Sequence, residues 1–256
     1  MPAARRSELC SDHSSPRQPC RLARAFFVDC GESWPAARFP FPPLGVSPVT
    51  EPAEPIRSAD VAGNPFATRW VRPGAIPFLF PPDQNAAKLV ERLRAFDWRG
   101  QIVGPHGSGK STLLHTLRPE LERAGREVVT FSLAGGQRRL DVSPTQRREW
   151  TAATLVVIDG FEPLNCWNRL RWNRQCRRAG AGLLVTTHCD VGLPTIAETT
   201  VTLETAQAIT ARLLAGHEGL VTTEEVAERF AKHAGNLRET LFDLYDLVER
   251  RQRGSG

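Results

Sequence analysis

Short apolar runs and amphipathic segments alternate along the chain from residue 100 onwards. The apolar runs are rich in Val, Ile and Leu, which is typical of strands that are buried on both faces in a parallel sheet. They predict strands over residues 100–104, 127–133, 154–159, 182–187 and 200–204. Helical spacing of the apolar residues between these runs predicts helices over residues 110–124, 143–150 and 163–179. The alternation indicates an α/β fold in which helices cover both faces of a parallel sheet.

The segments on either side of this α/β pattern are expected to be helical. One helix is expected over residues 83–96, with Asp83 as its N-cap. After the last expected strand, helices are expected over residues 205–216, 222–234 and 236–253. An apolar stripe along the last of these helices indicates that the three pack together as a small C-terminal helical lid.

Proline content divides the chain into parts. Residues 1–62 carry proline at short intervals and few apolar periods, so we expect a disordered tail. Residues 64–82 are too apolar for a free linker, and we expect them to pack on the core as an irregular strap. The expected domains are therefore the tail over 1–62, an α/β domain over 63–215 and the lid over 216–256.

Composition and charge agree with a water-soluble globular protein. The net charge of +5 and the isoelectric point near 9.1 allow phosphate-rich or nucleic-acid partners without requiring them. No apolar run approaches the length of a membrane span and no signal-peptide pattern follows the N-terminus, so we expect no membrane span and a cytoplasmic location. None of the six cysteines forms a C-x-x-C pair, which argues against a zinc site.

The most specific motif is a glycine-rich loop. Residues 104–111 read Gly-Pro-His-Gly-Ser-Gly-Lys-Ser and match the phosphate-binding loop G-x-x-x-x-G-K-[ST] at every fixed position. The glycines let backbone N–H groups approach phosphate oxygens, and the following helix adds the positive end of its dipole. Lys110 would reach the β- and γ-phosphates, and the Ser111 hydroxyl would ligate Mg²⁺. The expected nucleotide-binding residues are Gly104, Pro105, His106, Gly107, Ser108, Gly109, Lys110, Ser111 and Thr112.

The lysine in this loop is itself informative. The chain contains three lysines and thirty arginines, so nearly all of its cationic residues are arginines. Arginine is planar and forked, whereas lysine is a compact charge on a flexible stem. The loop therefore uses the cation that fits a phosphate-binding turn.

A second motif ends the predicted strand over residues 154–159. Its apolar residues lead to Asp159, which places a carboxylate at the carboxyl edge of the sheet, where the loop also lies. Asp159 follows Lys110 by 49 residues, with one strand–helix unit between them. We therefore expect Asp159 to share Mg²⁺ with Ser111.

Further polar residues are candidates for the chemistry. Glu162 could polarise an attacking water, or could cap the next helix. Thr187 or His188, at the end of a predicted strand, could contact the γ-phosphate or the water, or could satisfy local backbone groups. Arg238, at the start of the last helix, could reach the phosphates from the lid, or could remain exposed beside Glu239.

The order of these motifs resembles that of AAA+ and STAND-type P-loop ATPases over about residues 64–250. The resemblance implies a P-loop NTPase fold, ATP and Mg²⁺ as cofactors, ATP hydrolysis, and a nucleotide-sensing arginine in the lid, here Arg238 of Gly-Asn-Leu-Arg. The segment from Asp159 to Glu162 is similar to the Asp-Gly-hydrophobic-acidic form of the STAND and NACHT group. Gly160 replaces the glutamate that usually follows the aspartate, which argues against fast hydrolysis.

A rival resemblance is to ABC ATPase domains. Residues 133–138 are similar to the ABC signature Leu-Ser-Gly-Gly-Gln, and residues 185–188 are similar to the segment that carries the ABC switch histidine. Only 22 residues separate Lys110 from Leu133, however, which is too few for the helical subdomain that an ABC domain inserts there.

The predicted helix over residues 163–179 is strongly basic and also carries two tryptophans. It could face DNA, could supply an arginine finger to a neighbouring subunit, or could be a solvated helix whose tryptophans pack on the sheet. We favour the last interpretation. The residues concerned are Arg169, Arg171, Arg174, Arg177, Arg178, Trp167 and Trp172.

Together these patterns predict an Mg²⁺-dependent ATPase, or a slow ATP switch, that acts on a macromolecular partner. A protein partner, DNA and a homo-oligomer all remain open. A small-molecule kinase is disfavoured because no acceptor motif is present and a helical lid follows the sheet. ATP is favoured over GTP because the chain contains no Asn/Thr-Lys-x-Asp guanine motif.

Overall fold

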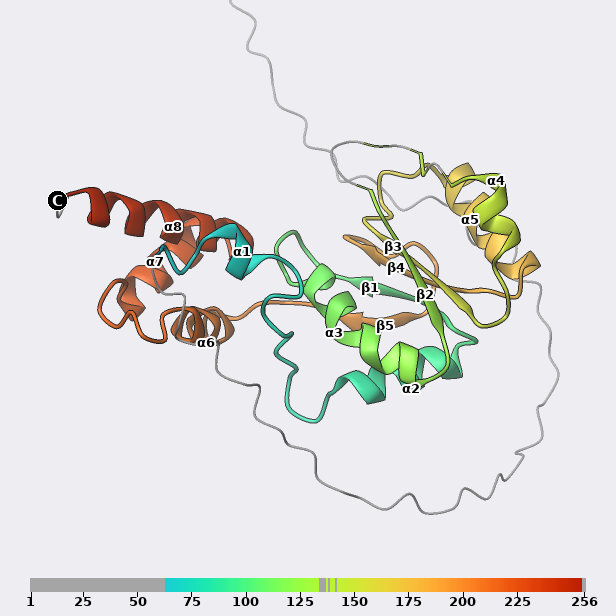
Figure 1. Ribbon diagram of the computed structural model, residues 1–256, viewed down its shortest axis with the longest axis horizontal. Helices are drawn as coiled ribbons and strands as arrows, with labels where there is room; N and C mark the ends of the chain where they lie inside the picture. The colour runs from blue at the N-terminus through green and yellow to red at the C-terminus, as the bar shows by residue number, and fades with distance from the viewer. Residues whose placement is uncertain (1–62, 134–136, 138, 141, 255–256) are drawn as a thin grey trace, which may run out of the picture. The chain divides into compact units, whose positions relative to one another are not determined.

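A five-stranded parallel sheet forms the centre of the protein (Figure 1). The computed structural model describes residues 63–133, 137, 139–140 and 142–254. The strand order is β2-β3-β4-β1-β5. Because β1 lies between β4 and β5, the chain must cross over β4 and β3 to reach β2. The strands are β1 (Arg99–Val103), β2 (Glu127–Ser132), β3 (Thr154–Asp159), β4 (Gly182–Thr187) and β5 (Thr195–Glu198).

Helices cover both faces of the sheet, which confirms the predicted α/β fold class. On one face, α2 (Ala86–Ala95) and α3 (Lys110–Arg123) pack against Leu155 and Val157 of β3. On the other face, α5 (Cys166–Arg178) packs against Val156 and Ile158 of the same strand. A strand that is buried on both sides needs a continuous apolar run, which is why β3 and β4 were predicted with their observed bounds.

A helical unit at the C-terminus has its own apolar core. It consists of α6 (Leu203–Leu213), α7 (Thr223–Lys232) and α8 (Leu237–Gly254). Phe66 is only 1% exposed in this core, and the Asn64 side-chain amide donates a hydrogen bond of 2.9 Å to the carbonyl of Tyr245. The N-terminal segment before the sheet is therefore anchored to the helical unit.

The apolar strap divides between two cores. Its first part includes the short helix α1 (Thr68–Val71) and packs with the helical unit, whereas Phe78 and Phe80 pack with α2 and α3. The Phe78 N–H donates a hydrogen bond of 3.0 Å to the Thr116 hydroxyl on α3. The strap thus runs beside the helix that begins at the phosphate-binding loop.

Two sequence predictions were wrong in position. The fifth strand was expected at 200–204 but occurs at β5, and Thr202 instead caps α6 by accepting a hydrogen bond from the Thr205 N–H. The helix expected from residue 83 begins at Ala86, and Asn85 is its N-cap. Asp83 has a φ of 65°, a left-handed backbone that lies outside the helix.

Parts of the prediction fall on residues outside the described ranges. The tail over 1–62 is one, and residues 134–136 and 138 of the ABC-like segment are another. The domain boundaries proposed from the sequence therefore stay predictions. Among the described residues, no helix combines the length and apolar character that crossing a membrane requires.

Candidate functional site

The phosphate-binding loop connects the carboxyl end of β1 to the first turn of α3. Gly107 and Gly109 have φ values of 69° and 89°, which residues with a side chain rarely adopt. A Cβ atom at Gly104 would lie 2.2 Å from the Thr199 hydroxyl oxygen and 2.5 Å from the Thr199 carbonyl oxygen. The loop can therefore keep this shape only with glycine at these positions.

Lys110 is buried inside the loop. Its ammonium group donates hydrogen bonds of 2.7 Å to the carbonyl oxygens of Gly104 and Pro105. Burial lowers the pKa of Lys110 from its ordinary value, and the carboxylates of Glu162 and Asp159 oppose this shift. The side chain is thus folded back along the loop, onto its carbonyl oxygens.

Asp159 is held by hydroxyl groups on both carboxylate oxygens. The Ser111 hydroxyl donates to Oδ2 at 2.7 Å, and the Thr186 hydroxyl donates to Oδ1 at 2.6 Å. Thr186 itself accepts a hydrogen bond of 2.8 Å from the Gly160 N–H. This network joins the loop, the end of β3 and the end of β4.

The oxygen pair of Ser111 and Asp159 fits a magnesium ion that is shared with a nucleotide. Mg²⁺ prefers oxygen ligands and is usually held by one or two protein groups together with phosphates and waters. Among the described residues, no group of three or more His, Cys, Asp or Glu side chains could hold a metal by itself. Ser111 and Asp159 would therefore leave the remaining coordination positions of such an ion to phosphates and waters.

Glu162 and His188 form a close pair beside the loop. Glu162 Oε1 lies 2.6 Å from His188 Nε2, and His188 Nδ1 lies 3.3 Å from Lys110 Nζ and 3.0 Å from the Gly104 carbonyl oxygen. Burial lowers the pKa of His188, Lys110 and His106 lower it further, and Glu162 and the Gly104 carbonyl raise it. The net shift of the His188 pKa is downward, which favours a neutral ring that donates from Nε2 to Glu162, while the Lys110 ammonium and the Gly104 carbonyl oxygen both lie close to Nδ1.

The second oxygen of Glu162 has a different environment. Oε2 is buried and has no hydrogen-bond partner in the part of the chain that the structure describes. A buried carboxylate oxygen without a partner is uncommon and indicates a place for a donor such as water. Gly160, with a φ of 82°, makes the turn that follows β3, and Glu162 comes two residues later.

The other predicted loop residues occupy varied environments. Ser108 is buried, and its hydroxyl shares a hydrogen bond of 2.6 Å with the Thr199 hydroxyl. Pro105 and His106 are exposed, and the His106 ring lies over the His188 ring with 3.6 Å between their centroids. Thr112 is half-buried, and its carbonyl accepts a hydrogen bond from Thr116.

The segment that contains Arg238 approaches the loop through the Asn236 side chain and the Arg238 backbone. A Cβ atom at Gly107 would lie 1.9 Å from Asn236 Oδ1 and 3.2 Å from the Arg238 backbone nitrogen. The Arg238 side chain is exposed, and its guanidinium lies over the Phe242 ring at 5.6 Å from the centroid. The structure therefore brings the start of α8, but not the Arg238 guanidinium, to the loop.

Sequence reasoning missed Thr186, Thr199 and Asn236. It considered Thr187 at the end of β4, but the Thr187 hydroxyl donates to the Cys189 carbonyl at 2.8 Å. Neighbouring side chains in a strand point to opposite faces of the sheet. The polar run at the end of β4 therefore contained a signal for Thr186, but the sequence does not show which face of the strand meets Asp159. Asn236 lies in the Gly-Asn-Leu-Arg segment that was singled out for Arg238, whereas nothing local in the sequence identifies Thr199.

The electrostatic coupling between Lys110 and His188 is testable. Replacing Lys110 by Ala should raise the pKa of His188, because the ammonium group disfavours the imidazolium and its removal admits water. The measurement is an NMR titration of histidine Cε1 protons, with His188→Gln to assign the signal. Lys88→Ala removes an exposed lysine on α2 and should leave the pKa unchanged. An unchanged or lower pKa in Lys110→Ala would contradict the assigned network.

Comparisons with known proteins concern the fold. No protein-family model and no curated protein sequence matches the chain. Similar solved structures include a DNA replication initiation factor (16% identity, TM-score 0.44, covering 64% of this chain and 62% of that chain). They also include the replication initiator DnaA bound to AMPPCP and single-stranded DNA, with 15% identity, a TM-score of 0.46, and coverage of 69% of this chain and 67% of that chain. A third is AMPPCP-bound DnaA from Aquifex aeolicus, with 16% identity, a TM-score of 0.46, and coverage of 70% of this chain and 68% of that chain.

The chain spans about three fifths of the length of the first of these proteins. At identities of 15–16%, the similarity concerns the path of the chain alone. Function must therefore be derived from the residues of this chain.

Proposed function

We propose that the chain binds Mg²⁺·ATP at the loop over residues 104–111 and hydrolyses it, and that it uses nucleotide state as a conformational switch on a macromolecular partner. One observation carries the proposal. The hydrogen bond of 2.7 Å between Ser111 and Asp159 joins the phosphate-binding loop to the acidic end of β3, and the Lys110 ammonium is held within the same loop. These residue types in this arrangement suit triphosphate binding and phosphoryl transfer.

The loop would bind the triphosphate and orient it. Backbone N–H groups of the loop and the first turn of α3 would meet the phosphate oxygens. Lys110 would exchange its two carbonyl partners for phosphate oxygens and would neutralise charge that develops on the γ-phosphate. Ser111 and Asp159 would hold Mg²⁺, which supplies further neutralisation of phosphate charge when bound.

Glu162 is the proposed general base. Its Oε1 is occupied by His188, whereas Oε2 is free among the described residues to accept a hydrogen bond from water. Such a contact would position the water and accept its proton as the water attacks phosphorus. His188 would act as a positioning residue, because it fixes the orientation of the Glu162 carboxylate.

We assign the response to nucleotide to the helical unit. Asn236 lies against Gly107, so a change in the loop conformation would displace the start of α8. Asn236 also accepts a hydrogen bond of 3.3 Å from the Glu239 N–H, which links it to the first turn of that helix. Arg238 would have to leave the Phe242 ring to reach a phosphate. Closure of the helical unit is therefore the proposed switch.

The direct test is nucleotide binding and phosphate release by the purified chain. We expect ATP to bind, EDTA to weaken that binding, and phosphate to be released slowly with half-saturation between about 1 μM and 1 mM. GTP in a parallel series tests the preference for adenine. If neither ATP nor GTP binds in the presence of Mg²⁺, the proposed function is wrong. ATP binding without phosphate release would support the proposed switch and contradict the proposed hydrolysis.

A further inference from the structure

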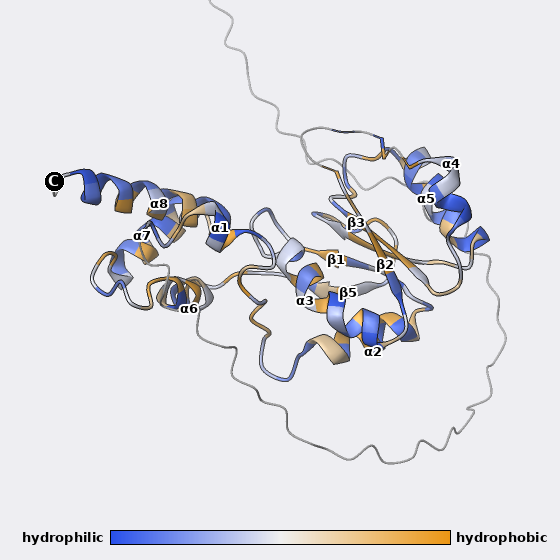
Figure 2. Cartoon of the chain, in the orientation of Figure 1, coloured by the Kyte–Doolittle hydropathy of each residue, from blue (hydrophilic) through white to orange (hydrophobic). Residues whose placement is uncertain are grey.

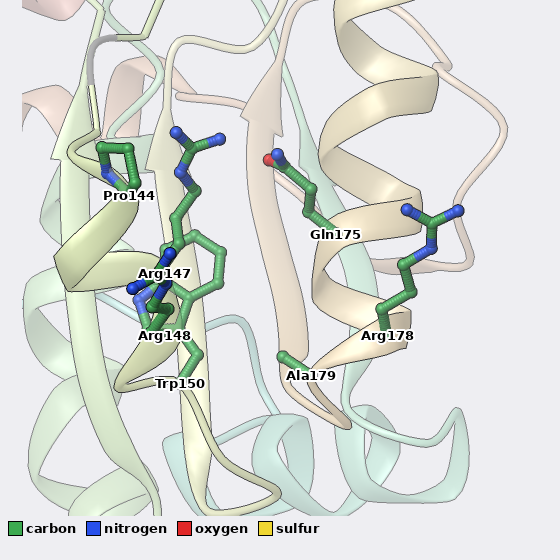
Figure 3. Close-up of a pocket in the computed structure, with 7 residues that line it drawn as sticks. All are labelled: Pro144, Arg147, Arg148, Trp150, Gln175, Arg178 and Ala179. Carbon is green, nitrogen blue, oxygen red and sulfur yellow. The ribbon is translucent and has the colours of Figure 1, made fainter.

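A pocket of about 460 Å³ lies between α4 (Pro144–Arg148) and α5 (Figure 3). Trp150 precedes the start of β3, and Ala179 precedes the start of β4. The pocket is therefore at the amino edge of the sheet, opposite the edge that carries the phosphate-binding loop. Its lining consists of Pro144, Arg147, Arg148, Trp150, Gln175, Arg178 and Ala179.

The pocket combines three kinds of chemical group. Arg147, Arg148 and Arg178 supply guanidinium donors, and within the described ranges none of them forms an ion pair. The Gln175 side-chain oxygen is buried and has no hydrogen-bond partner among the same residues. Trp150 is a largely buried residue that lines the pocket, and its ring lies 5.9 Å from that of Trp172. In the view of Figure 3 the Gln175 side chain extends from α5 between those of Arg147 and Arg178.

These groups complement a nucleotide better than a bare anion. Guanidinium groups bind phosphate oxygens, but an ionised phosphate offers no donor to the Gln175 oxygen. A nucleotide provides the N–H or O–H donors of its base or sugar as well as phosphate oxygens. The volume of about 460 Å³ lies within the range of small-ligand sites.

The exposed face of α5 continues the same chemistry away from the pocket. Trp167 is 80% exposed, and Arg171, Arg174 and Arg178 follow it at spacings of four, seven and eleven residues, which keeps them on one face. Helix α5 contains no acidic residue, and Figure 2 shows it largely blue. The exposure of Trp167 corrects the prediction that both tryptophans pack on the sheet, since only Trp172 is buried.

We propose that this face of α5, together with the α4–α5 pocket, binds single-stranded nucleic acid. The arginines contact successive phosphates, a base stacks on Trp167, and one nucleotide enters the pocket and donates a hydrogen bond to Gln175. Trp167 and Arg178 are separated along the helix by about 16 Å, so the face is long enough to meet more than one phosphate of a strand.

A single strand is favoured because its base faces are accessible, whereas those of a duplex are stacked on one another. An acidic peptide would satisfy the arginines but would leave Trp167 without a stacking partner. The site does not depend on nucleotide binding at the loop over residues 104–111.

The test measures binding of a labelled 20-nucleotide single strand by fluorescence anisotropy at several salt concentrations. The double variant Arg174→Ala/Arg178→Ala should bind at least tenfold more weakly and should reduce the slope of log K against log salt by about 1.4, since each phosphate contact on a single strand contributes about 0.7. The control Arg118→Ala/Arg123→Ala removes two exposed arginines of α3 with the same change in charge. It should stay within twofold of the wild type.

A second variant separates stacking from charge. Trp167→Ala should weaken binding by about fivefold or more, the lower end of the effect of a stacking contact, and should leave the salt slope unchanged. Lys110→Ala should bind the strand like the wild type, which distinguishes this site from the nucleotide loop. DNA and RNA strands of matched sequence identify which nucleic acid binds more tightly, and tight binding of either supports the proposal.

Several outcomes would overturn the proposal. Equal losses in the α5 double variant and the α3 control would mean that only net charge matters. Duplex DNA binding as tightly as the single strand, with no effect of Trp167→Ala, would remove the stacking contact. Polyglutamate competing as well as an unlabelled strand would identify a general polyanion surface. Loss of binding in Lys110→Ala would assign the strand to the nucleotide loop.

Discussion

Replacing Lys110 by Ala is expected to reduce ATP turnover by about 100-fold or more, the range seen when one preorganised donor is removed from a transition state. Lys110 is the only cationic side chain that the structure places inside the loop within the described ranges. Its ammonium group already lies in a buried position, so little reorganisation is needed when phosphate replaces the two carbonyl partners. ATP affinity should fall as well, because the same charge balances the bound triphosphate.

The conservative variant Lys110→Arg should fail to restore turnover. The lysine ammonium lies 2.7 Å from two carbonyl oxygens in a tight turn, where a point charge on a flexible stem fits. A planar, forked guanidinium is larger and cannot use both carbonyls in the same way. Because the chain has thirty arginines, this substitution tests whether the loop requires the shape of lysine as well as its charge.

Phosphate release and nucleotide binding are the measurements for both Lys110 variants. Lys88→Ala is the matched control, since Lys88 is an exposed lysine whose ammonium donates to the Asp83 carbonyl on the surface. It should retain full turnover. Circular dichroism and the unfolding midpoint check that the variants are folded. Turnover at the wild-type rate in folded Lys110→Ala would exclude the proposed role of the loop.

The parts of the fold that were predictable from the sequence are those determined by burial and local chemistry. The strands β3 and β4 are buried on both faces, so their bounds are visible as apolar runs. The strand β5 is an edge strand of four residues with the burial pattern exposed-buried-buried-exposed, and its pairing with β1 is irregular. Such a strand has no periodic signal in the sequence, and the residues predicted as the fifth strand instead contain the N-cap and the first turn of α6.

The candidate site shows the same division. The loop glycines and Lys110 form a contiguous motif because a tight phosphate-binding turn needs adjacent residues of fixed type. Thr186 and Asn236 contact this site from distant segments of the chain, and their roles depend on which face of a strand and which end of a helix is presented. No local pattern encodes that information, since it arises only when the sheet and the helical unit pack.

Replacing Glu162 by Gln is expected to lower turnover by about 100- to 10,000-fold, the range for loss of a general base, while ATP affinity stays near that of the wild type. Gln is nearly isosteric with Glu, and its carbonyl oxygen can still accept the hydrogen bond from His188 Nε2. What is lost is the capacity of the second oxygen to accept a proton. The effect should therefore appear in kcat rather than in nucleotide binding.

The variant His188→Ala separates chemistry from positioning. It leaves the carboxylate of Glu162 intact but removes the partner that fixes Oε1 at 2.6 Å. We expect a smaller loss of kcat than in Glu162→Gln, since a mobile carboxylate still accepts a proton when it meets the water. Glu198→Gln, at the exposed end of β5, changes the same functional group near the same edge of the sheet and should have no effect.

These three variants together decide which carboxylate acts on water. If turnover survives in Glu162→Gln but is lost in His188→Ala, the imidazole rather than the carboxylate carries the proton, and Glu162 only orients it. If both variants retain turnover, the unpartnered Oε2 has no role in hydrolysis, and the pair serves to hold the end of β4 against the loop. Loss in Glu162→Gln with retained ATP binding is the result that assigns the water to the buried Oε2 of Glu162.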